Sequence, residues 1–338
     1  MYSPSRYLLV MFGVFLIGFT ALWIFTANFR MAFLDTGYGE WSAKLSMIRK
    51  CDTGSVVILG DSRAAAAYTP KLLGFAAKNL ALSGSTAVEA YFELREILAC
   101  SRAPQAIVLS FAPIQFEEID WLWVHAVSYG QLSFYDLQDV ANSERALHRT
   151  ELYRTEFGAE PSPSVKNWLY ANHFPPYDFS SLLGAIGQGR TAKNLAFERE
   201  TLTNDGQHIV GTPLRCAPAP SSEVGRARFR VDPMIAIYLR RLLLLAREKQ
   251  VRVIFGPTAI SHMTSERIDP RYREEFVEFV HGLREQFSEV EVFDELLFVM
   301  DDCMFGDAHH LNAQGSEAFS IRWGRDMLNK ISGSASDR

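Results

Sequence analysis

The first feature of the hydrophobic pattern is a continuous apolar run at the N-terminus. From Tyr7 to Ala27 the chain carries no charge and is apolar except for two threonines, and Arg6 and Arg30 lie on either side. About 20 such residues in a helix match the thickness of the hydrocarbon core of a bilayer. The run is long for a signal peptide and contains no convincing small-residue cleavage site. We therefore predict an uncleaved membrane anchor over residues 1–30; a buried core helix is the less favoured alternative because the run is apolar on all sides.

Beyond a connecting stretch at residues 31–53, short apolar segments alternate with amphipathic ones. Apolar runs bounded by glycine or proline predict strands, and apolar residues at helical spacing predict helices. The expected strands lie at residues 56–59, 78–82, 106–111, 251–255 and 290–293, and the expected helices at 87–100, 233–249, 270–287 and up to about 331. This alternation is typical of an α/β fold with a mainly parallel five-stranded sheet, and right-handed crossovers place the carboxyl ends of the strands on one edge.

Between residues 116 and 231 the alternation breaks down. The segment is rich in aromatic residues and too long for an ordinary loop, so we predict an inserted lid or subdomain. Aromatic residues at this density can line a carbohydrate or acyl groove, but for each one taken alone, packing within the insertion is the favoured interpretation. Three histidines of the segment, His125, His173 and His208, show no partner in the sequence and are interpreted as ordinary polar residues.

The tripeptide Gly60-Asp61-Ser62 directly follows the first expected strand. Ligands of open α/β sheets bind at the carboxyl ends of the strands, and the N–H groups at the start of the next helix favour negative charge there. Ser62 is therefore well placed to act as a nucleophile. The alternative, which this segment alone favours, is that Asp61 or Ser62 only caps the next helix.

A second group of polar residues lies near the C-terminus, in the turn before the final helix. Asp307 and His310 are three residues apart, a spacing that lets the carboxylate reach a nitrogen of the imidazole. Together with Ser62 they would supply a nucleophile, a base and a carboxylate that orients the base. Two alternatives are that the pair decorates a helix start, or that it binds a metal with His309; the metal interpretation lacks a clear third ligand elsewhere and ranks lower.

These segments resemble the SGNH or GDSL-type hydrolases. The resemblance covers roughly residues 54–330 outside the insertion, and it is carried by Gly60-Asp61-Ser62, by Gly84 after the second strand, and by Asp307-Ala-His-His310, in the order of that family. It implies that Ser62 is the nucleophile, His310 the base and Asp307 its partner, with the N–H groups of Ser62 and Gly84 in the oxyanion hole. It implies neither a cofactor nor a metal.

One block departs from the family pattern. Family members usually carry an asparagine after the third strand, in a Gly-x-Asn-Asp block, as a further oxyanion donor, whereas this chain has Ser110-Phe-Ala-Pro113. Loss of one oxyanion donor typically costs on the order of a hundredfold or more in rate. We therefore expect either a replacement group or a weak or specialised activity.

The resemblance and the pattern together define an expected domain organisation. The anchor at residues 1–30 and the connection at 31–53 precede a catalytic domain at 54–332, a flavodoxin-like three-layer sandwich with the insertion at 116–231, and a tail at 333–338.

Composition restricts where the protein acts. The net charge is -5, and the sequence has no lysine-rich or arginine-rich block, so nucleic acid is not an expected partner. The four cysteines, Cys51, Cys100, Cys216 and Cys303, show no metal-ligand spacing; one or two disulfides in an exported domain are favoured over four free thiols in the cytosol. We expect a single-pass membrane protein with an exported catalytic domain, and the resemblance to the bacterial proteins described next implies the bacterial inner membrane with that domain on the periplasmic side.

An SGNH-like chain that is tethered to a membrane and lacks the asparagine after the third strand is similar to the acyl-transfer proteins of bacterial envelope polymers. Those proteins commonly work beside a membrane-bound O-acyltransferase. The resemblance implies O-acyl transfer, most simply O-acetyl transfer, to an exopolysaccharide or another envelope polymer through an acyl-serine. A polysaccharide esterase of the same fold and a non-catalytic anchored scaffold or polymer-binding protein are the two alternatives.

Overall fold

The structure is a computed structural model that describes residues 4–119, 122–149, 162–211, 216 and 219–333. The chain divides into two compact units, one of Met1–Gly39 with Trp123–Ala196 and one of Glu40–Leu122 with Phe197–Arg338. The expected C-terminal tail lies, from residue 334 onwards, outside the described residues.

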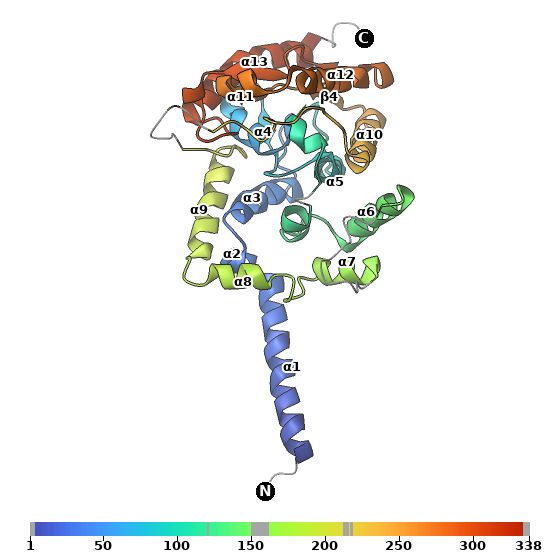
Figure 1. The fold of residues 1–338 in the computed structure, drawn as a ribbon, viewed down its shortest axis with the longest axis vertical. Helices are drawn as coiled ribbons and strands as arrows, with labels where there is room; N and C mark the ends of the chain where they lie inside the picture. The colour runs from blue at the N-terminus through green and yellow to red at the C-terminus, as the bar shows by residue number, and fades with distance from the viewer. Residues whose placement is uncertain (1–3, 120–121, 150–161, 212–215, 217–218, 334–338) are drawn as a thin grey trace. The chain divides into compact units, whose positions relative to one another are not determined.

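The first unit is helical (Figure 1). It contains α1 (Pro4–Asn28), α2 (Arg30–Phe33), a π-helical turn at Trp123–Val127, α6 (Phe134–Ala146), α7 (Pro163–Ala171), α8 (Phe179–Ala185) and the start of α9 (Arg190–Thr203). In α1 an 18-residue window has a mean hydropathy of 2.5 and none of its residues is buried. The helix is thus long and apolar enough to cross a membrane, a property that signal sequences share.

Aromatic side chains of the first unit pack against one another and against the C-terminal half of α1. Tyr170 stacks on Tyr177 with ring centroids 4.0 Å apart, and the Trp123 ring lies 4.5 Å from that of Tyr170. Phe174 meets Trp23 of α1 with centroids 5.1 Å apart. These ring contacts agree with the interpretation of such residues as packing residues.

The second unit contains the predicted parallel five-stranded sheet, in the order β2-β1-β3-β4-β6. Its strands are β1 (Val56–Gly60), β2 (Ala77–Asn79), β3 (Ala106–Ser110), β4 (Arg252–Phe255) and β6 (Val290–Val292). All four neighbouring pairs are parallel, and Gly60 lies opposite Ser110 at the carboxyl end of the sheet. The α/β fold and its sheet are therefore confirmed.

A second, two-stranded parallel sheet was not expected from the sequence. It pairs β5 (Thr258–Ser261) with β7 (Leu297–Met300). Strand β5 begins only three residues after β4, beyond Gly256-Pro257, and each strand has four residues. Segments this short carry too little periodicity to be told from loops.

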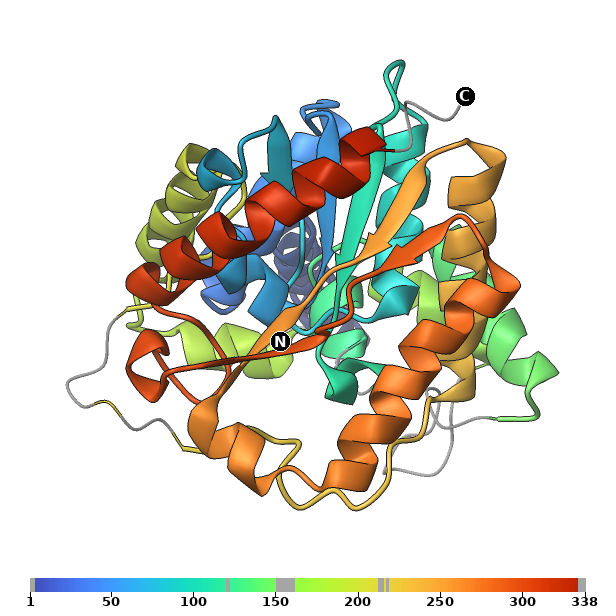
Figure 2. The same ribbon diagram turned by 90° about the horizontal axis from the view of Figure 1, so that it is seen from above.

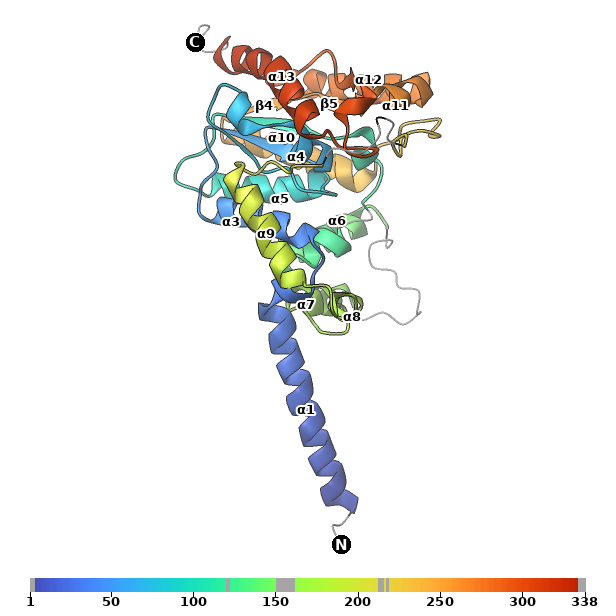
Figure 3. The ribbon, with the colours of Figure 1, turned by 90° about the vertical axis from the view of Figure 1, so that its left-hand side faces the viewer.

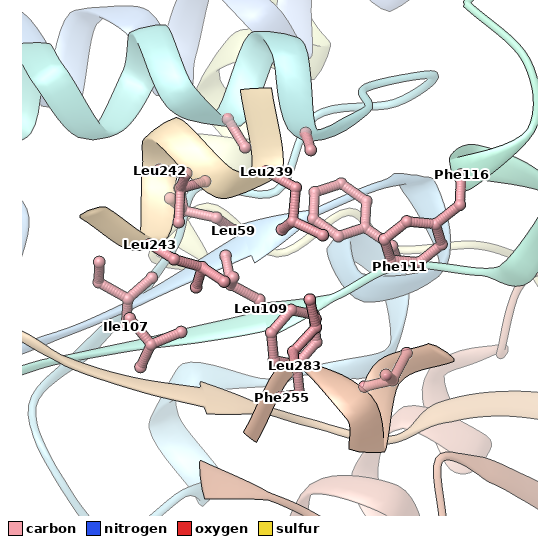
Figure 4. Packing of buried hydrophobic residues seen from close by; sticks show 14 of the residues in the cluster. Leu59, Ile107, Leu109, Phe111, Phe116, Leu239, Leu242, Leu243, Phe255 and Leu283 are labelled. Atoms are coloured by element: carbon pink, nitrogen blue, oxygen red, sulfur yellow. The ribbon is translucent and has the colours of Figure 1, made fainter. Parts of the chain in front are cut away.

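Helices cover both faces of the large sheet. On one face, Leu59 and Leu109 join a buried cluster with α5 (Ala87–Leu98), α10 (Pro233–Glu248) and α12 (Pro270–Gln286), and Figure 4 shows Leu239, Leu242 and Leu243 of α10 against these strands. On the other face Ile58 packs with α4 (Ser62–Ala67) and α13 (Ala313–Gly333). Figure 2 shows α13, in red, lying across the sheet, and Figure 3 shows α5 and α13 on opposite sides of it.

The remaining helices of this unit are short or lie at its start. They are α3 (Gly37–Arg49), which begins in the first unit, α11 (His262–Arg267), and the 3-10 turns Pro70–Leu72, Pro113–Phe116 and Asp302–Met304.

Two helix starts follow their sequence signals. Thr86 and Glu89 form the expected capping box of α5, in which each side chain bonds the backbone N–H of the other end of the box. Asp232 accepts the N–H groups of Met234 and Ile235 at the start of α10, with Pro233 as its first residue.

All four cysteines form disulfides. Cys51 at the end of α3 pairs with Cys100 after α5, and Cys216 pairs with Cys303 in the turn that precedes the Asp307/His310 segment. Four free thiols, the alternative interpretation, are not found.

Candidate functional site

Asp61 connects the carboxyl ends of two neighbouring strands. Its Oδ1 accepts the N–H groups of Arg63 (2.9 Å) and Ala64 (3.2 Å), so Asp61 is the cap of α4. Its Oδ2 accepts the N–H of Ala112, just beyond β3, at 2.8 Å. Burial raises the pKa of this carboxyl, although Arg63 and the three N–H groups oppose the rise. The cap interpretation thus applies to Asp61 and leaves the side chain of Ser62 available.

Ser62, His310 and Asp307 form one continuous hydrogen-bonded chain. His310 Nε2 lies 2.8 Å from Ser62 Oγ, and His310 Nδ1 lies 2.9 Å and 2.8 Å from the two carboxylate oxygens of Asp307. The structure therefore brings together the three residues that the sequence selects, across 248 positions of chain between Ser62 and His310.

The charge state of Asp307 sets the direction of these bonds. Partial burial alone would raise the pKa of Asp307, but the His310 ring and the backbone N–H groups of His309 and His310 hold it well below its ordinary value. An ionised carboxylate can only accept, so Nδ1 carries the proton and Nε2 is left as an acceptor for the Ser62 hydroxyl. This is the arrangement in which an imidazole can remove the proton of a serine nucleophile.

Backbone contacts fix the turn that carries this pair. Gly306 N–H donates to His310 O at 2.8 Å and Asn312 N–H to Met304 O at 2.9 Å, which closes the turn on itself. The Asn312 amide also donates to Cys303 O at 2.8 Å and to Phe305 O at 3.3 Å. Asn312 is 1 % exposed, so these bonds are sheltered from water and hold the Asp307/His310 segment in one conformation.

Gly84 lies in a turn that the sheet places near the end of β1. Leu82 N–H donates to Gly60 O at 2.9 Å. The segment that follows β2 therefore still pairs with the last residue of β1 just before the turn of Gly84. Gly84 has φ +76°, a backbone conformation that favours glycine. Within the described residues no acceptor is found for the N–H of Ser62 or of Gly84, so both donors are available to a ligand.

The segment that follows β3 offers no side-chain donor at residue 112. Ala112 is buried, and its N–H is bound to Asp61. The hydroxyl of Ser110 donates to Pro257 O at 2.9 Å. The end of β3 is therefore committed to structural hydrogen bonds.

A buried ion pair lies directly beside the candidate nucleophile. One guanidinium nitrogen of Arg63 lies 2.6 Å and 2.7 Å from the two carboxylate oxygens of Glu223, and the hydroxyl of Ser221 donates to Glu223 at 2.6 Å. The backbone N–H of the residue after Ser221, Ser222, donates to His309 Nε2 at 3.2 Å. This segment therefore contacts both α4 and the turn of Asp307, and no sequence motif indicates it.

His208, for which the sequence shows no partner, has two neighbours in the structure. Its ring lies near that of His310, with centroids 6.3 Å apart and an interplanar angle of 22°, and its Nδ1 lies 3.4 Å from Glu40 Oε2. Only the fold brings together the three residues, because they come from α3, from the segment after α9 and from the turn before α13.

Among the residues that the structure describes, no three His, Cys, Asp or Glu side chains gather in a way that could hold a metal ion. His309, the further ligand that a metal site would require, accepts the Ser222 N–H through Nε2. Comparison of the chain with protein-family models and with curated protein sequences finds no match.

Proposed function

We propose that this protein is an SGNH-type serine enzyme that transfers an O-acyl group to a polysaccharide or another polymer of the cell envelope. The observation that carries the proposal is the unbroken chain from Asp307 through His310 to Ser62, with bonds of 2.8 Å on both sides of the imidazole. Its position at the carboxyl edge of a parallel sheet is where α/β enzymes bind their ligands.

The reaction has two balanced halves. In the first, Ser62 Oγ attacks the carbonyl carbon of the acyl donor while His310 Nε2 takes the hydroxyl proton; the leaving group then departs with that proton and acyl-Ser62 remains. In the second, an acceptor hydroxyl gives its proton to His310 and attacks the acyl carbon, and Ser62 recovers the proton as the new ester leaves. Asp307 stabilises the imidazolium in both halves, and the N–H groups of Ser62 and Gly84 are the proposed oxyanion donors.

The proposal includes a location and the finer features of the fold. A helix able to span the membrane and two disulfides support a single-pass protein with an extracytoplasmic catalytic domain. We also propose that the large sheet and its two helical layers form a flavodoxin-like sandwich, and that the residues inserted at 116–231 act as a lid or subdomain. A membrane-bound O-acyltransferase is the proposed donor-side partner.

A hydrolase of the same fold is the second candidate, because water can replace the sugar hydroxyl in the second half-reaction without any change in the triad. The two are separated by whether acylated glycan or free acid accumulates when an acceptor is present. The third candidate, a non-catalytic anchored scaffold protein, is favoured only by the lack of an asparagine after the third strand.

The test is formation of acyl-Ser62 on the full chain in detergent. The protein is mixed with p-nitrophenyl acetate, release of p-nitrophenol is followed by stopped flow, and the quenched protein is weighed by mass spectrometry. We expect a burst and one added acetyl group on Ser62, and neither in Ser62→Ala. Ser55→Ala is the matched control, because Ser55 directly precedes β1, at the end opposite Ser62, and its hydroxyl donates to Ala76 O. Equal labelling of the wild type and Ser62→Ala would refute the proposal.

A further inference from the structure

A second carboxylate–imidazole pair lies beside the triad. His208 Nδ1 lies 3.4 Å from Glu40 Oε2, a longer and purely electrostatic contact compared with the 2.8 Å hydrogen bond between His310 Nδ1 and Asp307. The two imidazole rings are nearly parallel, at 22°, with centroids 6.3 Å apart. The two half-reactions described above use only His310.

Glu40 is rigidly held and ionised. The residue is 1 % exposed, and it accepts hydrogen bonds from Lys44 Nζ (2.6 Å) and from Ser83 Oγ (2.7 Å). Burial alone would raise the pKa of Glu40, but the charge of Lys44 and the nearby His208 hold it well below its ordinary value. A carboxylate beside Nδ1 favours the tautomer that carries its proton there, so Nε2 of His208 is an acceptor.

The remaining contacts of His208 fix its position and leave Nε2 accessible. Its backbone N–H donates to Ala65 O of α4 at 2.9 Å, and Phe197 packs edge-on against the ring with centroids 4.9 Å apart. About a quarter of the side chain is exposed. Within the described residues Nε2 makes no hydrogen bond and is not buried, so a small molecule can donate a hydrogen bond to it. Nδ1 is buried and makes no hydrogen bond, so its 3.4 Å approach to Glu40 Oε2 is an electrostatic contact.

Two nearly parallel imidazole rings suit one kind of acyl acceptor. In acyl-Ser62 the serine oxygen is esterified, so His310 Nε2 is free to take the proton of the attacking hydroxyl. A hydroxyl has only one proton, so it cannot also donate to His208. A 1,2-diol has a second hydroxyl on the neighbouring carbon, and each can make a hydrogen bond of about 2.8 Å to its own imidazole.

We propose that His208, oriented by Glu40, is a positioning residue that binds the second hydroxyl of a 1,2-diol acceptor and so selects sugar-like acceptors over simple alcohols. The inference rests on the proposed function, because it concerns the second half-reaction of acyl-Ser62. It names the class of acceptor, a vicinal diol, which the triad by itself does not select.

The experiment compares two acceptors of similar size. Acyl-Ser62 is formed on the full chain in detergent with p-nitrophenyl acetate, and its decay is followed by mass spectrometry with 1,2-propanediol or 1-propanol. In the wild type we expect the diol to accelerate the decay about three- to tenfold more than the alcohol, the factor that one neutral hydrogen bond supplies. In His208→Phe, which keeps an aromatic ring in the same place, the preference is expected to fall to one, with the acetylation burst within about twofold of the wild type.

A second variant and a control complete the test. His208→Asn keeps a donor for Glu40 but lacks an acceptor at the distance of Nε2, and it is expected to lose the preference as well. His309→Gln is the matched control: the His309 ring centroid is 5.9 Å from that of His310, but its Nε2 already accepts the Ser222 N–H, so the preference should remain.

The outcomes separate the two proposals. A burst with equal effects of diol and alcohol in the wild type overturns the role of His208 alone, and so does a preference that survives in both His208 variants. A burst slowed as much as the decay in those variants also overturns it, because His208 would then act through His310. Absence of acyl-Ser62 in the wild type overturns the proposed function and this inference with it.

Discussion

The buried Arg63–Glu223 pair gives the sharpest prediction for stability. The two side chains are 4 % and 0 % exposed, and Glu223 accepts Arg63 through both oxygens and Ser221 through one. In Glu223→Gln the guanidinium keeps its full charge in a buried site and loses the carboxylate to which it is hydrogen-bonded. Removal of one partner of a buried pair costs about 3–5 kcal/mol, which corresponds to a fall of about 6 to 20 °C in Tm for a domain of 150–250 residues.

A double-variant cycle separates the cost of the lone charge from the net value of the pair. Arg63→Met with Glu223→Leu removes both charges and keeps apolar volume, and such replacements are often neutral. We expect this double variant to recover most of the stability that Glu223→Gln loses. Glu118→Gln is the control, because the Arg226–Glu118 pair is 32 % and 40 % exposed and should contribute at most about 1 kcal/mol.

The pH dependence provides an independent check. Burial alone would raise the pKa of Glu223, but the Arg63 charge and the hydrogen bonds from Arg63 and Ser221 lower it below its ordinary value of 4.5. A lowered folded-state pKa means that the stabilisation is complete above 4.5 and is lost as the pH falls through the folded value. The wild type should therefore exceed Glu223→Gln in stability by a constant amount at neutral pH and by less in acid.

The assay is urea unfolding of the full chain in detergent between about pH 3 and pH 8, so that it enters the range below 4.5 where the loss is expected, and it is followed by near-ultraviolet circular dichroism. A loss in Glu223→Gln of less than about 1 kcal/mol at neutral pH, equal to that of an exposed pair, would refute the reasoning. A double variant that is less stable than Glu223→Gln would also contradict it.

Three further predictions concern the site and the cross-links. Gly60→Ala should cost about 1–3 kcal/mol or more in urea unfolding, because a Cβ at Gly60 would lie 1.9 Å from Ser110 O on the neighbouring strand. Asp307→Asn should slow the acetylation burst by on the order of 10³–10⁴-fold, because the amide no longer holds the imidazole in the required tautomer; an unchanged burst would argue against its role. The double variant Cys51→Ser/Cys100→Ser should lower the free energy of unfolding by about 2–4 kcal/mol under oxidising conditions. With a reducing agent present, the variant and the wild type should be equally stable.

Most of the large sheet could be predicted because its central strands are buried on both faces. Val56, Val57, Ile58 and Leu59 are each at most 1 % exposed, so the strand appears in the sequence as an unbroken apolar run. The β5/β7 pair could not be predicted in the same way. Thr258 and Ser261 are buried in β5. With polar residues at buried positions of a four-residue strand, the sequence shows neither an apolar run nor an alternation of apolar and polar residues.

The candidate site likewise contains residues that the sequence reveals and residues that it does not. Ser62, Asp307 and His310 lie in short local motifs at a strand end and in a turn before a helix, so their chemistry and order are visible in the sequence. Glu40, His208 and Glu223 lie in no such motif. Their relation to the triad depends on how distant segments meet, such as the 160 positions between Arg63 and Glu223, and no local spacing encodes that.

The missing asparagine after β3 and the imidazole of His208 have one consequence for the proposed reaction. With the Ala112 N–H bound to Asp61, the proposed oxyanion site has two backbone donors, and a missing donor typically costs about 2.7–4 kcal/mol of transition-state stabilisation. Both half-reactions then slow, so the donor must carry an activated acyl group, while reaction of acyl-Ser62 with water is slow as well. An acyl acceptor that donates an extra hydrogen bond to His208 recovers part of this loss, whereas a simple alcohol does not. Weak oxyanion stabilisation combined with a second acceptor nitrogen therefore favours transfer to a diol over hydrolysis, which is why we rank the transferase above the esterase.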